Sequence, residues 1–376
     1  MGVAVILAVM ASLVQTPAAD SSHLERVAKA LELARADIGA MVPIAEKTAA
    51  LLAAGGKLHA AGQPSLVSEI TGRAGGLMMI KPLAAAVPAE GDVVLCTPEP
   101  GVELPEALRD TKAMVVVFGA PVKDRDWLAF DNHARDTGIS PTLANAIHAW
   151  MFTGELVAAL TRLGKMPVIY ETIGAYGGYP RMAKYKSGEI AFHDDCTVPP
   201  CAAEVLAKAY VDAVTAMLRR IDKEERAQLD QAGAWVRKAR KSQKQLFMYS
   251  MGHLFPDEVA RTDIGKAFHS AGWNAGFRVT HPEDSYQDGD LAVHICYQHP
   301  TDALLRKARP AGARVVYVSL FADRDFAKDD GVIWIDPMWN WSDACVQLEG
   351  YDVPLLPASG IVNGAIAWEI YRLGAE

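Results

Sequence analysis

Four side chains that can take up or release a proton lie at or near predicted loops of this chain. Glu69 lies one turn into the helix that follows the first predicted loop, where it could also pair with Arg73 four residues on. His133 follows the end of a predicted strand, where a lone histidine more often makes a loop hydrogen bond. Glu171 and His193 lie in a middle segment that has no counterpart elsewhere in the chain. Carboxylates and imidazoles are the groups that remove a proton next to a carbonyl, so these four residues are the candidate catalytic acids and bases.

A second set of polar residues could hold a ligand. Gln63 and Ser65 lie where the chain reverses beyond the carboxyl end of a predicted strand, which is where α/β proteins bind ligands. Arg73 could hold an anion, and Thr97 and Glu99 lie in the loop that follows the next strand. That loop carries two prolines, which have no N–H to donate, and the carboxylate of Glu99 would repel a phosphate. We predict that these five residues bind the substrate, and that the loop with Glu99 is poorly suited to a phosphate.

Two groups of metal-ligand residue types occur, but their spacing does not match a strong metal motif. One is His294 with Cys296 and His299, and the other is the run 193–196 with Cys201. Neither has paired CxxC or HExxH spacing, so we predict no metal site. The chain also lacks a GxxxxGK[ST] segment, a GxGxxG motif after a predicted strand and a GxSxG elbow. These absences argue against nucleotide cofactors and serine hydrolase chemistry, and we predict no cofactor.

Helical and strand patterns alternate along the chain in a way that favours parallel sheets. Continuous apolar runs between helices are typical of parallel strands that are buried on both faces. In the first half the predicted elements are helix Leu24–Leu52, strand Lys57–Ala61, helix Leu66–Arg73, strands Val93–Leu95 and Met114–Phe118, and helix Leu143–Leu163. In the second half they are helix Lys223–Lys241, strand Gln245–Ser250, helix Asp257–Ser270, strands Leu291–Ile295 and Val315–Leu320, and helix Ile361–Leu373.

Four landmarks recur in the same order with a period of about two hundred residues. They are Gly-Asp before an apolar strand, a cysteine at the end of that strand, an apolar strand leading to Asp-Arg-Asp-aromatic, and a Pro…Asn…Trp series. The first copy has them at Gly91-Asp92, Cys96, 113–127 and 141–150, and the second at Gly289-Asp290, Cys296, 313–326 and 357–368. The repeat predicts two homologous α/β units, in the ranges 20–165 and 221–376, joined by an insertion and a linking helix in 166–220.

Composition bounds the class of protein. The chain has 376 residues, of which 51% are hydrophobic and 22% charged, the profile of a soluble globular protein of about two domains. Its net charge of −8 argues against nucleic acid as a partner. The apolar stretch Val3–Val14, followed by small residues up to Ala19, is typical of a signal peptide. We expect export or a periplasmic location, with a cytoplasmic protein or a membrane-anchored one as the alternatives.

The opening of the first unit resembles a known family. The run Ala-Ala-Leu-Leu-Ala-Ala-Gly-Gly-Lys-Leu-His-Ala-Ala-Gly, which ends at Gly62, is similar to the first helix and strand of the sugar isomerase (SIS) domain family. Gly91-Asp92-Val-Val-Leu resembles that family's approach to its second loop. The resemblance covers most of both halves, as in the isomerase portion of glucosamine-6-phosphate synthase. It implies two tandem three-layer α/β/α units with mostly parallel central sheets.

The resemblance also implies a function. SIS domains bind phosphosugars through Ser and Thr hydroxyls at such loops, a role that falls to Ser65 here, so the chain is expected to bind a sugar or sugar phosphate and to favour isomerisation through an enediol. Because the loops after Cys96 and Cys296 lack a run of hydroxyl residues, a neutral or acidic sugar derivative is an alternative ligand. A noncatalytic binding or regulatory module and a structural partner in a periplasmic assembly also stay open. SIS-type proteins commonly pair their units to complete a site, which leaves a homo-oligomer as a further expectation.

Overall fold

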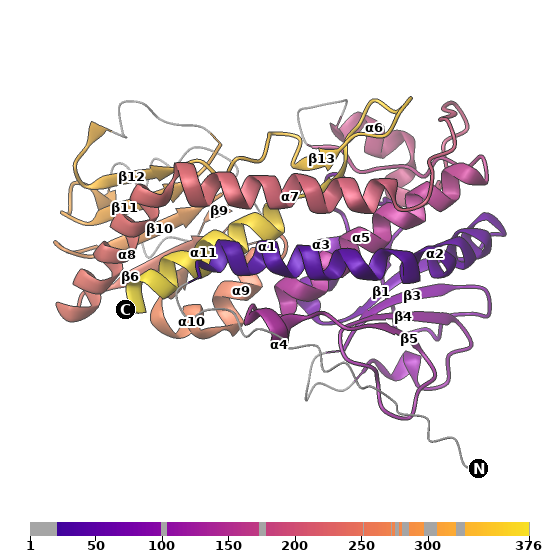
Figure 1. Cartoon of the computed structure of the whole chain (residues 1–376), viewed down its shortest axis with the longest axis horizontal. Helices are drawn as coiled ribbons and strands as arrows, with labels where there is room; N and C mark the ends of the chain where they lie inside the picture. Colours follow the sequence, from indigo (N-terminus) through magenta and orange to yellow (C-terminus); the bar gives the residue numbers. More distant parts are fainter. Residues whose placement is uncertain are drawn as a thin grey trace, which may run out of the picture.

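The computed structural model describes residues 21–98, 104–172, 178–250, 252–271, 273–274, 278–279, 286–296, 307–320 and 328–375. The candidate leader 1–19, Glu99 and His299 lie outside these residues. In the described part, two parallel five-stranded sheets lie at opposite ends of an elongated molecule, and long helices run between them (Figure 1). This mixed α/β architecture confirms the predicted fold class and is consistent with two tandem three-layer α/β/α units.

The first sheet contains the strands that the apolar runs predict. It consists of β1 (Leu58–Gly62), β2 (Lys81–Pro82), β3 (Val93–Thr97), β4 (Met114–Phe118) and β5 (Leu128–Phe130), in the spatial order β2-β1-β3-β4-β5. All its pairings are parallel. Every residue of β3 is buried, as expected for a central parallel strand whose sequence is apolar up to Thr97.

The second sheet repeats this order. Its strands are β6 (Leu246–Ser250), β7 (His269–Ala271), β10 (Leu291–Ile295), β11 (Arg314–Val318) and β12 (Val332–Ile335), in the order β12-β11-β10-β6-β7. Counted along the chain, the first strand of each sheet therefore lies between the second and the third. Two antiparallel pairs complete the described strands: β8 (Trp273–Asn274) with β9 (Arg278–Val279), and β13 (Ala344–Val346) with β14 (Leu355–Pro357).

The predicted helix Asp257–Ser270 is wrong at its carboxyl end. The structure has α9 (Phe255–Arg261) and α10 (Asp263–Ala267), and strand β7 follows them. Thr262 separates the two helices with extended backbone angles, φ −106° and ψ −176°. Gly265 then packs so closely on α9 that a Cβ would lie 2.1 Å from the carbonyl oxygen of Val259. The chain therefore turns here instead of continuing as one helix.

Long helices connect the two ends of the molecule. They are α1 (His23–Ala34), α2 (Ile38–Ala53), α5 (Pro141–Arg162), α7 (Val205–Glu224), α8 (Arg226–Lys241) and α11 (Ser359–Ala375). Shorter ones are α3 (Pro64–Ile70), α4 (Ala134–Thr137) and α6 (Gly178–Lys184). In each half a helix before the sheet packs on the helix that closes it, α2 on α5 and α8 on α11. Helices α1 and α7 each contact the other half of the molecule: α1 contacts α11, and α7 contacts α5. Each half therefore helps to cover the other.

Helix α5 is the central element of the core. Pro141 at its first turn and Ser140, whose hydroxyl accepts a hydrogen bond from the Leu143 N–H, fix where it begins. It is the one helix in the described ranges that is long and apolar enough to cross a membrane, but its apolar window is 100% buried inside the protein. We therefore interpret it as a core helix. One continuous cluster of buried apolar residues extends from α1 to α11 through both halves.

The repeated Gly-Asp landmark has a structural purpose in both sheets. The two carboxylate oxygens of Asp92 accept hydrogen bonds from the backbone N–H groups of Lys57 (2.8 Å) and Ala89 (2.9 Å). Asp290 accepts from Gln245 (3.0 Å) and Gln287 (2.8 Å) in the same way. Each aspartate thus ties the residue before one central strand to the turn that opens the next.

Replacing Asp92 by Asn should lower the free energy of unfolding by about 1–3 kcal/mol at neutral pH, because the amide turns a donor toward a buried N–H. Burial raises the pKa of Asp92, but the N–H donors from Lys57 and Ala89 outweigh it and hold the pKa below 3.8. A carboxyl group with a lowered pKa stabilises the fold above its unfolded value, and this contribution is lost as the pH falls below that value. Urea unfolding should therefore show the difference at pH 7 and a smaller one below pH 3.8. A pH-independent difference would contradict this explanation.

Candidate functional site

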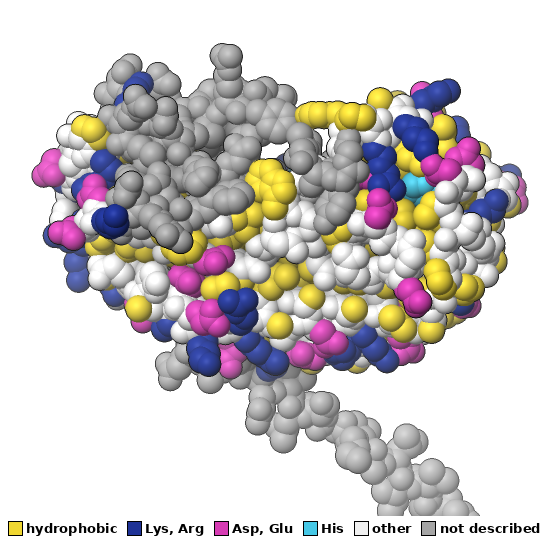
Figure 2. All heavy atoms as spheres, turned by 90° about the horizontal axis from the view of Figure 1, so that it is seen from above, with side chains coloured by type: hydrophobic (Ala, Val, Ile, Leu, Met, Phe, Trp, Pro, Cys, Tyr) yellow, Lys and Arg dark blue, Asp and Glu magenta, His cyan; other side chains and the backbone are white. Residues whose placement is uncertain are grey.

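A pocket opens beside α6, in the middle segment that the sequence analysis singled out. Its volume is about 570 Å³, and it is lined by Pro180, Arg181, Lys184, Tyr185, His193, Asp195, Cys196, Gly350 and Asp352. Most of these side chains are polar or charged. On the face shown in Figure 2, basic and acidic side chains lie next to one another around a histidine instead of forming a patch of one sign.

His193 lies at the centre of a chain of hydrogen bonds in this pocket. Its Nδ1 is 2.7 Å from the Tyr185 hydroxyl and its Nε2 is 2.9 Å from the Tyr351 hydroxyl. The Tyr185 hydroxyl donates to Asp195 at 3.0 Å, so it can accept from an Nδ1–H. Nε2 is then the acceptor for Tyr351. This order gives every hydroxyl and ring nitrogen a partner and continues from one tyrosine through the imidazole to a carboxylate.

Burial lowers the pKa of His193, and this outweighs the hydrogen bond that the ring donates to Asp195, which raises it. The imidazole therefore stays neutral at neutral pH and offers one donor and one acceptor. Lys184, beside it, forms an ion pair with Asp195 and its pKa is raised by that hydrogen bond. A neutral imidazole that is already aligned between hydroxyl groups is equipped for proton transfer.

Arg181 carries the second charge network of the pocket. Its guanidinium lies 2.5 Å from a carboxylate oxygen of Glu171 and 3.1 Å from Asp352. The other oxygen of Glu171 accepts a hydrogen bond from the Gly178 N–H at 3.0 Å, which anchors the start of α6. The Glu171 side chain is only 1% exposed, and burial raises its pKa while Arg181 lowers it. Glu171 therefore lies next to the pocket, where it holds Arg181.

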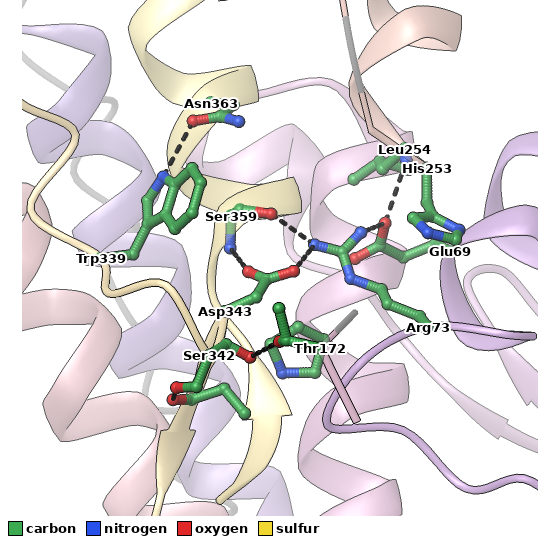
Figure 3. Close-up of polar contacts among 12 residues, drawn as sticks. Glu69, Arg73, Thr172, His253, Leu254, Trp339, Ser342, Asp343, Ser359 and Asn363 are labelled. Carbon is green, nitrogen blue, oxygen red and sulfur yellow. Dashed lines mark hydrogen bonds and ion pairs between the residues drawn. The ribbon is translucent and has the colours of Figure 1, made fainter. Parts of the chain in front are cut away.

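Glu69 and Arg73 meet in a buried network at the boundary between the halves (Figure 3). They form an ion pair within α3 and the turn after it, and Arg73 also donates to Asp343 (3.1 Å) and Ser359 (2.6 Å) at the start of α11. The N–H of Leu254, in the loop after β6, donates to Glu69 at 3.0 Å. Glu69 is 0% and Arg73 1% exposed. These two predicted site residues are therefore brought together, but as a connection between elements far apart in the sequence.

The repeated tryptophans stabilise equivalent buried carboxylates. Trp150 on α5 donates from Nε1 to Glu69 at 2.9 Å, and Trp368 on α11 donates to Glu258 on α9 at 2.6 Å. Both carboxylates are buried on the short helix that follows the first strand of a sheet, and burial raises the pKa of each. The Pro…Asn…Trp landmark thus ends in the same contact in both halves.

Gly360 lets α11 approach this network. A Cβ on Gly360 would lie 2.4 Å from a carboxylate oxygen of Glu69, whereas one on Gly39 in α2 would meet nothing closer than 4.0 Å. We expect Gly360→Ala to lower the urea midpoint by an amount equivalent to about 1–3 kcal/mol. The matched change Gly39→Ala should be neutral or stabilising by up to about 1 kcal/mol. Equal effects of the two changes would contradict the close approach.

Three predicted binding residues lie at the carboxyl edge of the first sheet. Gln63 is held there, since its N–H donates to the Thr97 carbonyl (2.9 Å) and its amide to Thr142 on α5 (2.7 Å). The hydroxyl oxygens of Ser65 and Thr97 are buried, and neither has a hydrogen-bond partner within the described residues. Buried hydroxyls without partners are uncommon and are available to a ligand. Glu99, predicted for the same edge, lies outside the described residues.

His133 belongs to neither group. It lies before α4 and contacts Asp37 and His148, away from the residues that line the pocket. Among the described residues, neither metal-ligand group weighed in the sequence brings three ligand atoms together, and His299 lies outside those residues. Cys296 lies 3.4 Å from His294, while Cys196 lines the pocket and Cys201 packs against α5 through Arg162. All five cysteines are free thiols.

Sequence reasoning missed the site roles of Tyr185, Tyr351 and Asp195, and it missed His253. Tyr351 comes from the loop between β13 and β14, and no local pattern connects it with His193. His253 had a usable signal, because it follows β6 as Gln63 follows β1. Its Nδ1 donates to the Ser68 carbonyl at 2.8 Å, and burial together with Arg73 lowers its pKa to about 4. It is therefore a neutral imidazole at the same boundary as Glu69 (Figure 3).

No protein-family model matches the chain, and no curated protein matches it. Several solved structures are similar to it over nearly their whole length. The C-terminal domain of glucosamine-fructose-6-phosphate aminotransferase from Francisella tularensis is 13% identical, with 95% of this chain and 97% of that chain covered and a TM-score of 0.49. A protein described as sugar binding from Salmonella typhimurium is 10% identical, with 94% and 97% covered and a TM-score of 0.49. Tagatose-6-phosphate ketose/aldose isomerase from Escherichia coli is 11% identical, with 94% and 91% covered and a TM-score of 0.44.

The structural neighbours are SIS-domain proteins. They belong to the family that the sequence resembles, at low sequence identity.

Proposed function

We propose that this protein binds a neutral sugar or sugar derivative in the pocket beside α6 and isomerises it with His193 as the acid–base group. The observation that carries the proposal is the hydrogen-bonded series Tyr351, His193, Tyr185 and Asp195 in a pocket of about 570 Å³. That volume lies within the range of small-molecule sites. The lining offers donors and acceptors together, which suits a ligand with many hydroxyl groups.

The charges of the pocket favour an uncharged ligand over a phosphate. Arg181 and Lys184 are the cations among its described lining residues, and both are already paired with carboxylates: Arg181 with Glu171 and Asp352, and Lys184 with Asp195. Three carboxylates therefore offset two cations. A phosphate would have to compete with these partners and would approach their negative charge. Neutral and amino sugars avoid that cost.

Isomerisation of an aldose to a ketose moves one proton between neighbouring carbons and one between their oxygens, so it needs no redox partner. His193 can take the first proton at Nε2, the acceptor nitrogen, because the ring is neutral at neutral pH. The phenols of Tyr185 and Tyr351 contact its two nitrogens and can return a proton to oxygen. These groups supply both halves of an enediol reaction without a free carboxylate base.

A noncatalytic sugar-binding module is the second candidate, and one observation favours it. The two carboxylates predicted as bases, Glu69 and Glu171, are both buried in ion pairs with arginines. A protein that retained the binding pocket and lost catalysis would still bind sugars and would not convert them.

Thermal unfolding against matched panels of neutral sugars, amino sugars, uronic acids and their phosphates tests the proposal. Ligand binding at a hundredfold excess over Kd adds about 2.7 kcal/mol to the free energy of unfolding, which is readily detected. We expect stabilisation by unphosphorylated compounds and little by phosphates. The active compounds are then incubated with the protein and analysed for isomers. Binding with conversion supports the enzyme, binding without conversion supports the module, and stabilisation by phosphates alone would contradict the assignment of the pocket.

A further inference from the structure

Three metal-ligand side chains converge from three separate elements. Asp37 ends the short turn between α1 and α2, His133 precedes α4 in a left-handed conformation (φ 55°), and His148 lies in the middle of α5. The Nε2 atoms of both histidines are 3.0 Å from the same carboxylate oxygen, Oδ2 of Asp37. One ligand atom of each residue lies within 4.8 Å of the other two.

The second ring nitrogen, Nδ1, of each histidine is directed at an acceptor of the protein. Nδ1 of His148 is 3.2 Å from the Ala144 carbonyl, which can only accept a hydrogen bond, so Nδ1 carries the hydrogen. Nδ1 of His133 lies 3.5 Å from the carboxylate of Asp136. The two Nε2 atoms and Oδ2 of Asp37 therefore face one another, while the outer nitrogen of each ring is directed at a protein acceptor.

We propose that Asp37, His133 and His148 form a binding site for a divalent transition-metal ion of the Zn²⁺ class. Imidazole nitrogen and carboxylate oxygen are ligands for such ions, with bonds of about 2.0–2.2 Å. In a tetrahedral site those bonds separate the ligand atoms by about 3.3–3.5 Å, close to the 3.0 Å between each Nε2 and Oδ2 here. Metal-binding histidines typically direct their other nitrogen to a carbonyl or carboxylate, as both rings do.

The site has room for solvent at a fourth position. His148 is only 1% exposed, but the side chains of Asp37 and His133 are 30% and 22% exposed, so one side of the cluster opens to water. Three protein ligands with an open fourth position describe a reactive metal site more closely than a closed structural one. This assignment departs from the prediction of no metal site, because the three ligands lie far apart in the sequence and form no local motif. It does not depend on the sugar pocket.

Metal binding to untagged protein tests the proposal directly. The protein is stripped with a chelator, dialysed, and titrated separately with Zn²⁺ and Co²⁺ at neutral pH. We expect one equivalent of Zn²⁺ by elemental analysis and a visible absorption band with Co²⁺ that saturates at one equivalent. Asp37→Asn and His133→Gln should each weaken binding at least ~10-fold, since each removes a ligand. His59→Gln is the matched control, because its Nε2 lies 3.7 Å from Asp92 in a histidine–carboxylate pair outside the cluster.

Each outcome decides the question. Stoichiometric binding that both ligand variants weaken and the control retains supports the site. Failure of the wild-type protein to bind either ion would overturn it and show that hydrogen bonds alone hold the three side chains together. Binding that survives in a folded Asp37→Asn variant, as judged by circular dichroism, would also overturn it, by showing that the ion lies elsewhere. His133→Gln provides a second test if Asp37→Asn does not fold, because His133 is partly exposed.

Discussion

Replacing Arg73 by Met is expected to destabilise the protein by about 3–5 kcal/mol or more. The change removes the cation that pairs with two buried carboxylates, Glu69 and Asp343, which are 0% and 3% exposed. Removing one partner of a buried ion pair leaves an uncompensated charge and typically costs this much. The urea midpoint at neutral pH measures the loss.

Two controls separate this effect from the loss of any arginine. Arg220 pairs with Glu224 at the same four-residue spacing, but the two side chains are 58% and 46% exposed, so Arg220→Met should leave the urea midpoint nearly unchanged. Adding Glu69→Gln to Arg73→Met should recover part of the loss, because one of the stranded carboxylates becomes neutral. A loss below about 1 kcal/mol for Arg73→Met would contradict the network.

Replacing His193 by Gln is expected to lower kcat for sugar isomerisation by about 10²–10⁴-fold while the sugar still stabilises the protein. Positioned proton transfer contributes that much to rate, and Gln retains hydrogen bonds but cannot transfer the proton. Burial also lowers the pKa of His193, so kcat/KM of the wild type should persist to below pH 6.5, the ordinary value for histidine. Steady-state assays across pH measure both.

Two tyrosines on or beside α6 provide the controls for that experiment. Tyr185→Phe removes the hydroxyl that joins His193 to Asp195 and should also lower kcat. Tyr179→Phe changes a side chain that is 55% exposed and does not line the pocket, so it should leave kcat unchanged. An unchanged kcat in His193→Gln would show that another group transfers the proton.

Much of the fold could be predicted because its signals are local. The apolar runs 93–95 and 291–295 become central strands, and the Gly-Asp landmark before each becomes the same carboxylate clamp, through Asp92 and Asp290. The alternation of helices and strands along the chain predicts a parallel sheet. The single predicted helix Leu24–Leu52 is in fact α1 and α2 with a short turn at residues 35–37 between them. The sequence did not predict this break because no glycine or proline lies in the turn. The internal repeat as a duplication stays a prediction.

The site was less accessible to sequence reasoning, because its contacts join residues that are far apart. Spacing suggested the Glu69–Arg73 pair, but not that Asp343 and Ser359 would enclose it and remove it from solvent. His193 was selected from its place in a segment without a counterpart, while its partner Tyr351 lies 158 residues away. Residue type indicates chemistry, but burial decides which groups stay available for it.

Alkylation of Cys196 with and without a stabilising sugar tests the central claim most directly. Cys196 lines the proposed pocket, and Cys201, five residues on, is also a half-buried free thiol but does not line it. Burial raises the pKa of both thiols, so the rates with and without sugar are compared for each thiol at one pH. We expect the sugar to slow modification of Cys196 in proportion to its saturation of the protein, as measured by peptide mass spectrometry, and to leave Cys201 unchanged. A sugar that stabilises the protein without protecting Cys196, or that protects both thiols equally, would show that it does not bind in this pocket.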